Sequence, residues 1–377
     1  MNSPTGAVEY RHYDSAPPKP NLKSKLLSLE AGRGIAALLV VLFHCWHHCR
    51  EAYGDFWLGG LFAFGHAGVD FFFVLSGFII LHAHRRDIGD PSRLLNFVKR
   101  RFTRIYPVYW VIFAITLIVL SLSSGAFPSG LGIAISALLL PTRNFPIMAD
   151  TWTLQHEILF YSFFGVLIWN RNLGAIAFGA WLIALIAARF EPIQSQSGLV
   201  LRLTATFDFE FFLGMGAAWI NKDLVLPAPK LFAAAGFLSF LAVGTAENIG
   251  MIHHWSSFTH LGYGIAAAVL VSGLTAWERG GTMRLPALLV VMGDSSYTLY
   301  LVHVLVVGML WQVLVHLGIA YALPAWVTYI VLAVGSVIVA VVARRTIERP
   351  MIAVLRRLLS RRPAPVPPMV AGRTGCE

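Results

Sequence analysis

Residues 27–47 read LSLEAGRGIAALLVVLFHCWH, a largely apolar run that is interrupted by only a few polar side chains. A helix that crosses a bilayer needs about 20 mostly apolar residues, so this run predicts a transmembrane helix. The composition agrees, because 57% of the 377 residues are hydrophobic and only 13% are charged. Further runs of this kind fall at 61–83, 105–122, 153–169, 173–189, 206–221, 230–246, 259–277, 287–315 and 325–347. The sequence therefore predicts an all-α fold, a polytopic transmembrane helical bundle.

An additional apolar run at 129–141 is bounded by Pro128 and Pro141 and is too short to cross. The strongly basic regions are the N-terminal tail, the connection at 85–104 and the C-terminal tail. Lys and Arg are retained on the cytoplasmic side of a membrane, so all three regions are expected there, which requires an even number of crossings. We expect about ten crossing helices, a short non-crossing helix at 129–141, and both termini in the cytoplasm.

The chain divides into a tail at 1–25, expected to be disordered, a membrane domain at 26–348, and a basic and then Pro-rich tail at 349–377. The formal net charge of +10 could indicate nucleic acid as a partner. The basic residues instead collect in the tails and in a few loops, as a membrane protein requires. Membrane lipids are therefore the expected surroundings, and nucleic acid is not an expected partner.

Arg33 and His44 lie eleven residues apart in the first predicted helix. Eleven steps of about 100° bring both side chains to one face, separated by about 16 Å along the axis. Ionisable side chains inside a span usually face the bundle interior and serve function, so this face predicts one wall of a channel. Two simpler interpretations stay open, since an arginine near a helix end can extend to the interface and a histidine can be a satisfied core group.

A second polar feature is a run of basic residues just before the third predicted helix. Arg100, Arg101 and Arg104 share one helical face through i,i+3 and i,i+4 spacing. Guanidinium groups in this arrangement suit phosphate groups. A lipid headgroup anchor explains the same charges equally well, so the residues alone leave both interpretations open.

Other ionisable side chains fall inside predicted spans, namely Asp70, Glu157 and His303. A carboxylate and an imidazole in one dry cavity form an acid–base pair. The stretch His44-Cys45-Trp46-His47-His48-Cys49 contains two i,i+4 pairs of metal-ligand type. The two pairs point about 100° apart on a helix, so we expect no metal there.

Five segments, taken in order, resemble the acyltransferase-3 family of membrane acyltransferases, especially those that O-acetylate exopolysaccharides and other glycans in bacteria. The segments are Arg33-Gly34-Ile35-Ala36-Ala37 leading to His44; Gly68-Val69-Asp70-Phe71-Phe72-Phe73-Val74-Leu75-Ser76-Gly77-Phe78; Arg100-Arg101-Phe102-Thr103-Arg104-Ile105-Tyr106-Pro107; Trp152-Thr153-Leu154 with Glu157 and Phe160-Tyr161; and Ser296-Tyr297-Thr298-Leu299-Tyr300-Leu301-Val302-His303. The match spans nearly the whole chain.

The resemblance implies an O-acyltransferase in the cytoplasmic (inner) membrane of a bacterium. It implies acetyl-CoA or another acyl-CoA as the cytoplasmic donor, a hydroxyl of a glycan or lipid-linked sugar as the extracytoplasmic acceptor, and no metal or resident cofactor. His44 would act as general base or transient acyl carrier, and Glu157 would orient it or hold the acceptor. The coenzyme phosphates would bind Arg33, Arg100, Arg101 and Arg104, and Asp70, Trp152, Tyr297 and His303 would support the site or the acceptor.

Two other classes of protein fit the same composition. A transporter or flippase of a lipid-linked sugar would be favoured by two repeated halves, and no internal repeat of useful strength is visible in the sequence. A non-catalytic partner in polysaccharide export would tolerate loss of His44 and Glu157. The enzyme is therefore the leading hypothesis.

Overall fold

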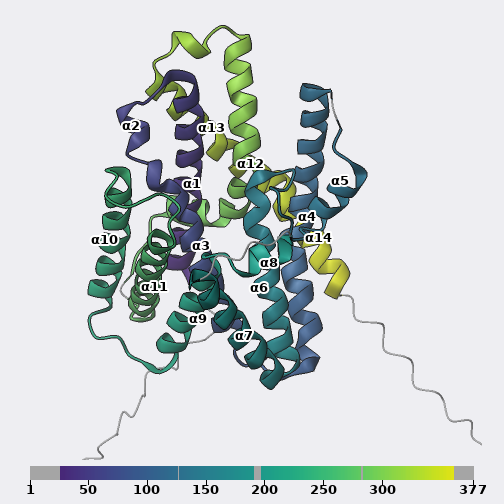
Figure 1. Cartoon of the computed structure of the whole chain (residues 1–377), viewed down its shortest axis with the longest axis vertical. Helices are drawn as coiled ribbons and strands as arrows, with labels where there is room; N and C mark the ends of the chain where they lie inside the picture. The colour runs from purple at the N-terminus through teal and green to yellow at the C-terminus, as the bar shows by residue number, and fades with distance from the viewer. Residues whose placement is uncertain (1–25, 126, 191–196, 282, 361–377) are drawn as a thin grey trace, which may run out of the picture.

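A computed structural model describes residues 26–125, 127–190, 197–281 and 283–360, and all regular structure in these ranges is helical (Figure 1). The expected all-α bundle is confirmed. The expected disorder of the N-terminal tail, and the Pro-rich end of the C-terminal tail, fall outside the described residues.

In the described ranges, ten long helices build the bundle. They are α1 (Leu27–Tyr53), α3 (Gly68–His84), α4 (Pro91–Ser124), α6 (Trp152–Trp169), α7 (Arg171–Phe190), α9 (Asp208–Asp223), α10 (Pro229–Asn248), α11 (Ser257–Arg279), α12 (Ala287–His316) and α13 (Ala325–Ala343). Short elements connect or end them: α2 (Trp57–Gly60), η1 (Ala63–Ala67), α5 (Gly130–Ala137), η2 (Ala149–Thr151), α8 (Gly198–Leu203), η3 (Ala320–Ala322), η4 (Arg344–Glu348) and α14 (Arg349–Ser360).

Eight helices in the described part of the chain are long and apolar enough to cross a membrane, so the expected count of about ten is not confirmed. The difference comes from α6 and α9, which correspond to the predicted spans 153–169 and 206–221. The α9 helix is only 16 residues long, and α6 carries three consecutive polar residues, Gln155, His156 and Glu157. The segment 129–141 forms the eight-residue helix α5, too short to cross, as expected.

The α4 helix joins the basic run and the following apolar run into one element of 34 residues. Its start is fixed by Asp90, whose side chain accepts a hydrogen bond from the Ser92 backbone N–H at 3.0 Å, and by Pro91 at the first helical position. The residues expected to begin the C-terminal tail instead form α14, which packs against α4. The arginines near the start of α4 are therefore held on a rigid element.

Small residues allow the central helices to approach closely. A Cβ atom added at Gly34 of α1 would lie 2.6 Å from the backbone nitrogen of Gly293 in α12, so these two helices cross almost backbone to backbone. The same applies where Gly214 of α9 faces the backbone of Val74 in α3. Close crossings of this kind are typical of helices packed in membranes. Figure 1 shows α10 and α11 on one side of the bundle and α4 with α14 on the other.

Candidate active site

A cavity of about 800 Å³ lies between α1, α4, α12 and the η4–α14 segment, and we call it the basic cavity. Six of its lining side chains are basic and three are acidic. The basic ones are Arg33, Lys99, Arg100, Arg101, Arg104 and Arg344. The acidic ones are Glu30, Asp294 and Glu348. The excess of guanidinium groups suits an anionic ligand, above all one that carries phosphates.

The structure brings together the four arginines that the sequence singles out. Arg100, Arg101 and Arg104 come from one stretch of α4, and Arg33 of α1 faces them across the basic cavity. The Arg101 guanidinium lies over the rings of Phe97 and Tyr161, at 5.8 and 5.5 Å. Such cation–π contacts hold a guanidinium in place without neutralising its charge.

A second, narrower cavity of about 80 Å³ continues from the first, and we call it the inner cavity. The two share four lining residues, Arg33, Arg101, Arg104 and Tyr297. The other walls of the inner cavity are mostly apolar and come from α3, α4, α6 and α12. A charged group that enters the basic cavity therefore meets, at its inner end, an apolar passage of small cross-section.

Glu157 of α6 lines the inner cavity beside the arginines. Its carboxylate accepts hydrogen bonds from the hydroxyl of Tyr161 and, at 3.4 Å, from that of Ser76. It also lies within electrostatic reach of Arg33. The sequence suggested that Glu157 could work directly on His44, whereas the structure places it with the arginine-lined half of the site.

His44 and His303 form a pair on the far side of the inner cavity. Their ring centroids are 4.9 Å apart. His303 donates a hydrogen bond from Nδ1 to the backbone oxygen of Tyr300 at 2.6 Å, and its Nε2 is buried without a hydrogen-bond partner. An imidazole whose one nitrogen is fixed in this way has its other nitrogen oriented.

The stretch of α1 between Arg33 and His44 faces the protein interior, as predicted. Ala37, Val40 and Val41 are all at most 2% exposed. However, the lining of the two cavities, as far as the described residues go, does not include His44. The passage expected to reach His44 is therefore not open along its whole length.

Tyr300 of α12 stands between the inner cavity and the histidines. It lines the cavity, and its ring centroid lies 5.7 Å from that of His303. Its hydroxyl donates to the backbone oxygen of Asp150 at 2.8 Å and lies 2.8 Å from the hydroxyl of Thr153. These two contacts fix the Tyr300 side chain, which both lines the inner cavity and neighbours His303.

Several residues of this site were not singled out from the sequence, namely Ser76, Thr153, Tyr161 and Tyr300. Each belongs to one of the five segments that carry the family resemblance, so a signal was present. Tyr297, which was singled out, lines both cavities and donates a hydrogen bond to the backbone oxygen of Ile105 at 2.8 Å. The hydroxyl-bearing side chains thus form the polar part of a largely apolar wall.

Asp150, in the connection before α6, is buried behind Tyr300 and outside the spanning helices. Burial raises the pKa of the Asp150 carboxyl to about 7. Its Oδ2 atom has no hydrogen-bond partner. This carboxyl is therefore a group whose protonation state changes near neutral pH.

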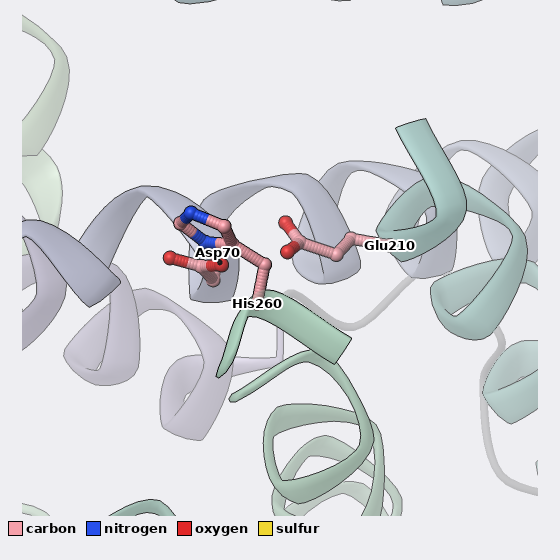
Figure 2. Close-up of side chains that lie close together, drawn as sticks. All are labelled: Asp70, Glu210 and His260. Carbon is pink, nitrogen blue, oxygen red and sulfur yellow. Dashed lines mark hydrogen bonds and ion pairs between the residues drawn. The ribbon is translucent and has the colours of Figure 1, made fainter. Parts of the chain in front are cut away.

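Two further candidates lie apart from the cavities. Trp152 packs against the rings of Phe207 and His156, at 4.9 and 5.5 Å. Asp70 of α3 is fully buried, and its Oδ1 atom accepts a hydrogen bond from Nδ1 of His260 at 2.6 Å. Figure 2 shows Asp70 and His260 beside Glu210. The sequence could not reveal this cluster, because its members lie on three helices far apart in the chain.

Comparison with known proteins shows the family to which this chain belongs. The family model described as an acyltransferase domain matches residues 26–345. The exopolysaccharide production protein ExoZ of Rhizobium meliloti (strain 1021) is 31% identical over 81% of this chain and 94% of the relative. The acyltransferase MdmB of Streptomyces mycarofaciens is 28% identical over 75% and 79%.

The nodulation protein 10 of Rhizobium leguminosarum bv. viciae is 24% identical over 88% of this chain and 94% of the relative. No solved structure matches the chain. The matched region contains the inner cavity, the histidine pair and all of the lining of the basic cavity except Glu348 and Ile352. The chain therefore belongs to the acyltransferase-3 family, and it is a membrane-embedded enzyme that transfers acyl groups other than aminoacyl groups.

Proposed function

We propose that this enzyme moves an acyl group, an acetyl group in the first instance, from cytoplasmic acyl-CoA to a hydroxyl of a glycan or glycolipid on the extracytoplasmic side. One observation carries the proposal: the basic cavity narrows directly into the inner cavity, which leads toward a pair of imidazoles. One relative, ExoZ, is named as an exopolysaccharide production protein, which supports a glycan acceptor.

The chemistry of the donor fits the two cavities. Coenzyme A carries several phosphates at one end and a long, flexible thioester arm at the other. The arginines of the basic cavity suit the phosphates, and the narrow, mostly apolar inner cavity suits the extended arm. A lipid headgroup would satisfy the same charges, but these arginines line an internal cavity that continues into the protein.

His44 is the proposed centre of the transfer step. As a general base, its neutral imidazole removes the proton from the acceptor hydroxyl while the oxygen attacks the thioester carbon. The carbon–sulfur bond breaks, and the proton passes to the departing thiolate of coenzyme A. As an acyl carrier, the His44 ring nitrogen instead attacks the thioester carbon, the carbon–sulfur bond breaks, and the proton of the other ring nitrogen passes to the coenzyme A thiolate. The acceptor hydroxyl then attacks the acyl carbon, the carbon–nitrogen bond breaks, and the hydroxyl proton returns to the imidazole. Both routes require the Tyr300 side chain to move aside.

Sidedness follows from charge and topology. The arginines of the basic cavity belong to regions that the positive-inside rule assigns to the cytoplasm. The eight helices long enough to cross are an even number, which is compatible with both termini on that side. We therefore propose a multi-pass protein of a bacterial inner membrane, with the donor bound from the cytoplasm and the histidines toward the other face.

The test uses the full chain in liposomes with radiolabelled acetyl-CoA and a membrane glycolipid extract from the host bacterium. We expect release of free coenzyme A thiol and label in the glycolipid fraction. His44→Ala should abolish both, whereas His47→Ala should retain both, since His47 is an exposed histidine on the same helix, paired with Glu51. Movement of the glycolipid across the bilayer without thiol release would support a flippase and contradict this proposal.

A further inference from the structure

Two buried carboxylates and an imidazole converge in the bundle outside both cavities. Asp70, Glu210 and His260 come from α3, α9 and α11, which pack against one another. Their nearest donor atoms all lie within 4.8 Å of one another. Figure 2 shows the Glu210 carboxylate directed toward Asp70 and His260. The exposure of the three residues is 0%, 0% and 2%.

The hydrogen bonds around this cluster are incomplete. His260 donates to Oδ1 of Asp70 at 2.6 Å, but Oδ2 of Asp70 and both oxygens of Glu210 have no hydrogen-bond partner among the described residues. Three carboxylate oxygens are thus buried without a donor. A buried carboxylate left in this condition is strongly unfavourable, so a positive species must lie among them.

A shared proton is the simplest positive species, and it accounts for only part of the cluster. One proton between Asp70 and Glu210 satisfies one oxygen of each residue. The remaining oxygen of Glu210 still has no donor. A divalent cation can be bound by one oxygen of each carboxylate and by an imidazole nitrogen of His260, in place of the proton that His260 shares with Asp70. Two carboxylates and a neutral imidazole balance its charge.

The distances suit a metal ion of ordinary size. One ion with bonds of about 2.0–2.2 Å holds three ligand atoms at most about 3.8 Å from one another. Side-chain movements of up to about 1 Å would bring the three donor atoms, which lie within 4.8 Å of one another, to that spacing. Gly264 of α11 lets this helix lie close beside the Glu210 side chain, because a Cβ atom there would lie 3.0 Å from Cγ of Glu210.

We propose that Asp70, Glu210 and His260 bind one divalent transition-metal cation and thereby join α3, α9 and α11. Imidazole and carboxylate ligands together favour zinc or manganese over calcium or magnesium. As far as the described residues go, none of the three lines either cavity, so the proposed ion holds the helices together and takes no part in acyl transfer.

The experiment measures metal content in the full chain, purified in detergent with an affinity tag that contains no histidine. We expect about one zinc or manganese ion per chain by mass spectrometry, after desalting and after incubation with each metal in turn. Glu210→Gln and Asp70→Asn should lower the content at least fivefold. Glu247→Gln is the matched control, because Glu247 is equally buried but accepts hydrogen bonds from His66 and Tyr263.

Three results would overturn the proposal. The wild-type chain could hold neither metal, or the Glu210→Gln chain could hold as much metal as the wild type. The X-ray absorption spectrum of the bound metal could also show sulfur among its ligands. The spectrum is measured on the wild type, so it decides the matter even where a variant fails to fold. Sulfur ligands would assign the metal to the cysteines of the chain, Cys45, Cys49 or Cys376, and not to this cluster. A nitrogen and oxygen shell supports the proposal.

Discussion

The ring of His303 lies 4.9 Å from the ring of His44, and the backbone oxygen of Tyr300 fixes its Nδ1. Two helices, α1 and α12, thus supply the two imidazoles of one site, and their backbones nearly touch at Gly34 and Gly293. The close crossing and the histidine pair belong together, because a wider crossing would separate the rings.

Replacement of His303 tests this arrangement. His303→Ala should lower kcat for acyl transfer about tenfold to a hundredfold. The loss in His44→Ala should be larger, because a positioned imidazole that exchanges protons contributes a factor of about 10²–10⁴ to the rate. KM for acetyl-CoA should stay within about twofold of the wild-type value, since the arginines bind the donor. Steady-state kinetics in liposomes measure both. An equal loss from both variants would indicate that His303 exchanges the proton itself.

The arginines of α4 should govern donor affinity. Arg100→Gln and Arg104→Gln should each raise KM for acetyl-CoA about tenfold, because each removes a charge-assisted hydrogen bond to phosphate of about 1.5–3 kcal/mol. Arg93→Gln is the control: this arginine lies on the same helix but is exposed and paired with Asp90. A similar KM for all three variants would argue for a headgroup anchor.

Glu157 should affect turnover more than donor binding. Glu157→Gln keeps a hydrogen-bond acceptor for Tyr161 and Ser76 but removes the negative charge beside Arg33. With this charge gone, Arg33 attracts the donor phosphates more strongly, so KM should fall or stay constant while kcat falls about tenfold. A rise in KM with unchanged kcat would contradict this role.

Asp150 should make the stability of the protein depend on pH. Its pKa of about 7 in the folded protein is far above the ordinary value of about 3.9. The stability that the protonated Asp150 contributes is therefore full below about pH 4, falls as the pH rises toward 7, and is lost above that pH. The fall in Tm between pH 5 and pH 8 should be smaller by several degrees in Asp150→Asn than in the wild type. Asp55→Asn, which changes an exposed carboxylate, should leave this fall unchanged. Thermal unfolding in detergent between pH 5 and pH 8 measures the difference.

The crossing of α1 and α12 should be intolerant of even one methyl group. Gly34→Ala places a Cβ atom 2.6 Å from the backbone of Gly293, so we expect a loss of about 1–3 kcal/mol. Gly308→Ala on α12 meets nothing within 4 Å and should be neutral or slightly stabilising. Unequal shifts in Tm would support the crossing, and equal shifts would contradict it.

Much of the helical architecture could be predicted from the sequence, because apolar runs of spanning length have few alternatives in a bilayer. The exact number of crossings could not. The polar residues of α6 and α9 make both helices look less like spans, and these are the helices that carry Glu157, His156 and Glu210 into the interior.

Several side chains that line the two cavities could be singled out from the sequence, but the contacts between them could not. Helical spacing places Arg33 and His44 on one face, and it groups the arginines of α4. Spacing cannot reveal contacts between helices far apart in sequence, so the position of Glu157 among the arginines and the position of Tyr300 before the histidines required the structure.

The α12 helix carries Tyr297, Tyr300 and His303 within an arc of about 120° and about 9 Å of axial rise. Substitutions elsewhere on this helix leave that angular phase intact. Insertion or deletion of a single residue between Tyr297 and His303 would rotate one part by about 100° against the other. We therefore expect this stretch to accept changes in residue type far more readily than changes in length. The number of residues between Tyr297 and His303 sets the orientation of the cavity lining relative to the imidazoles.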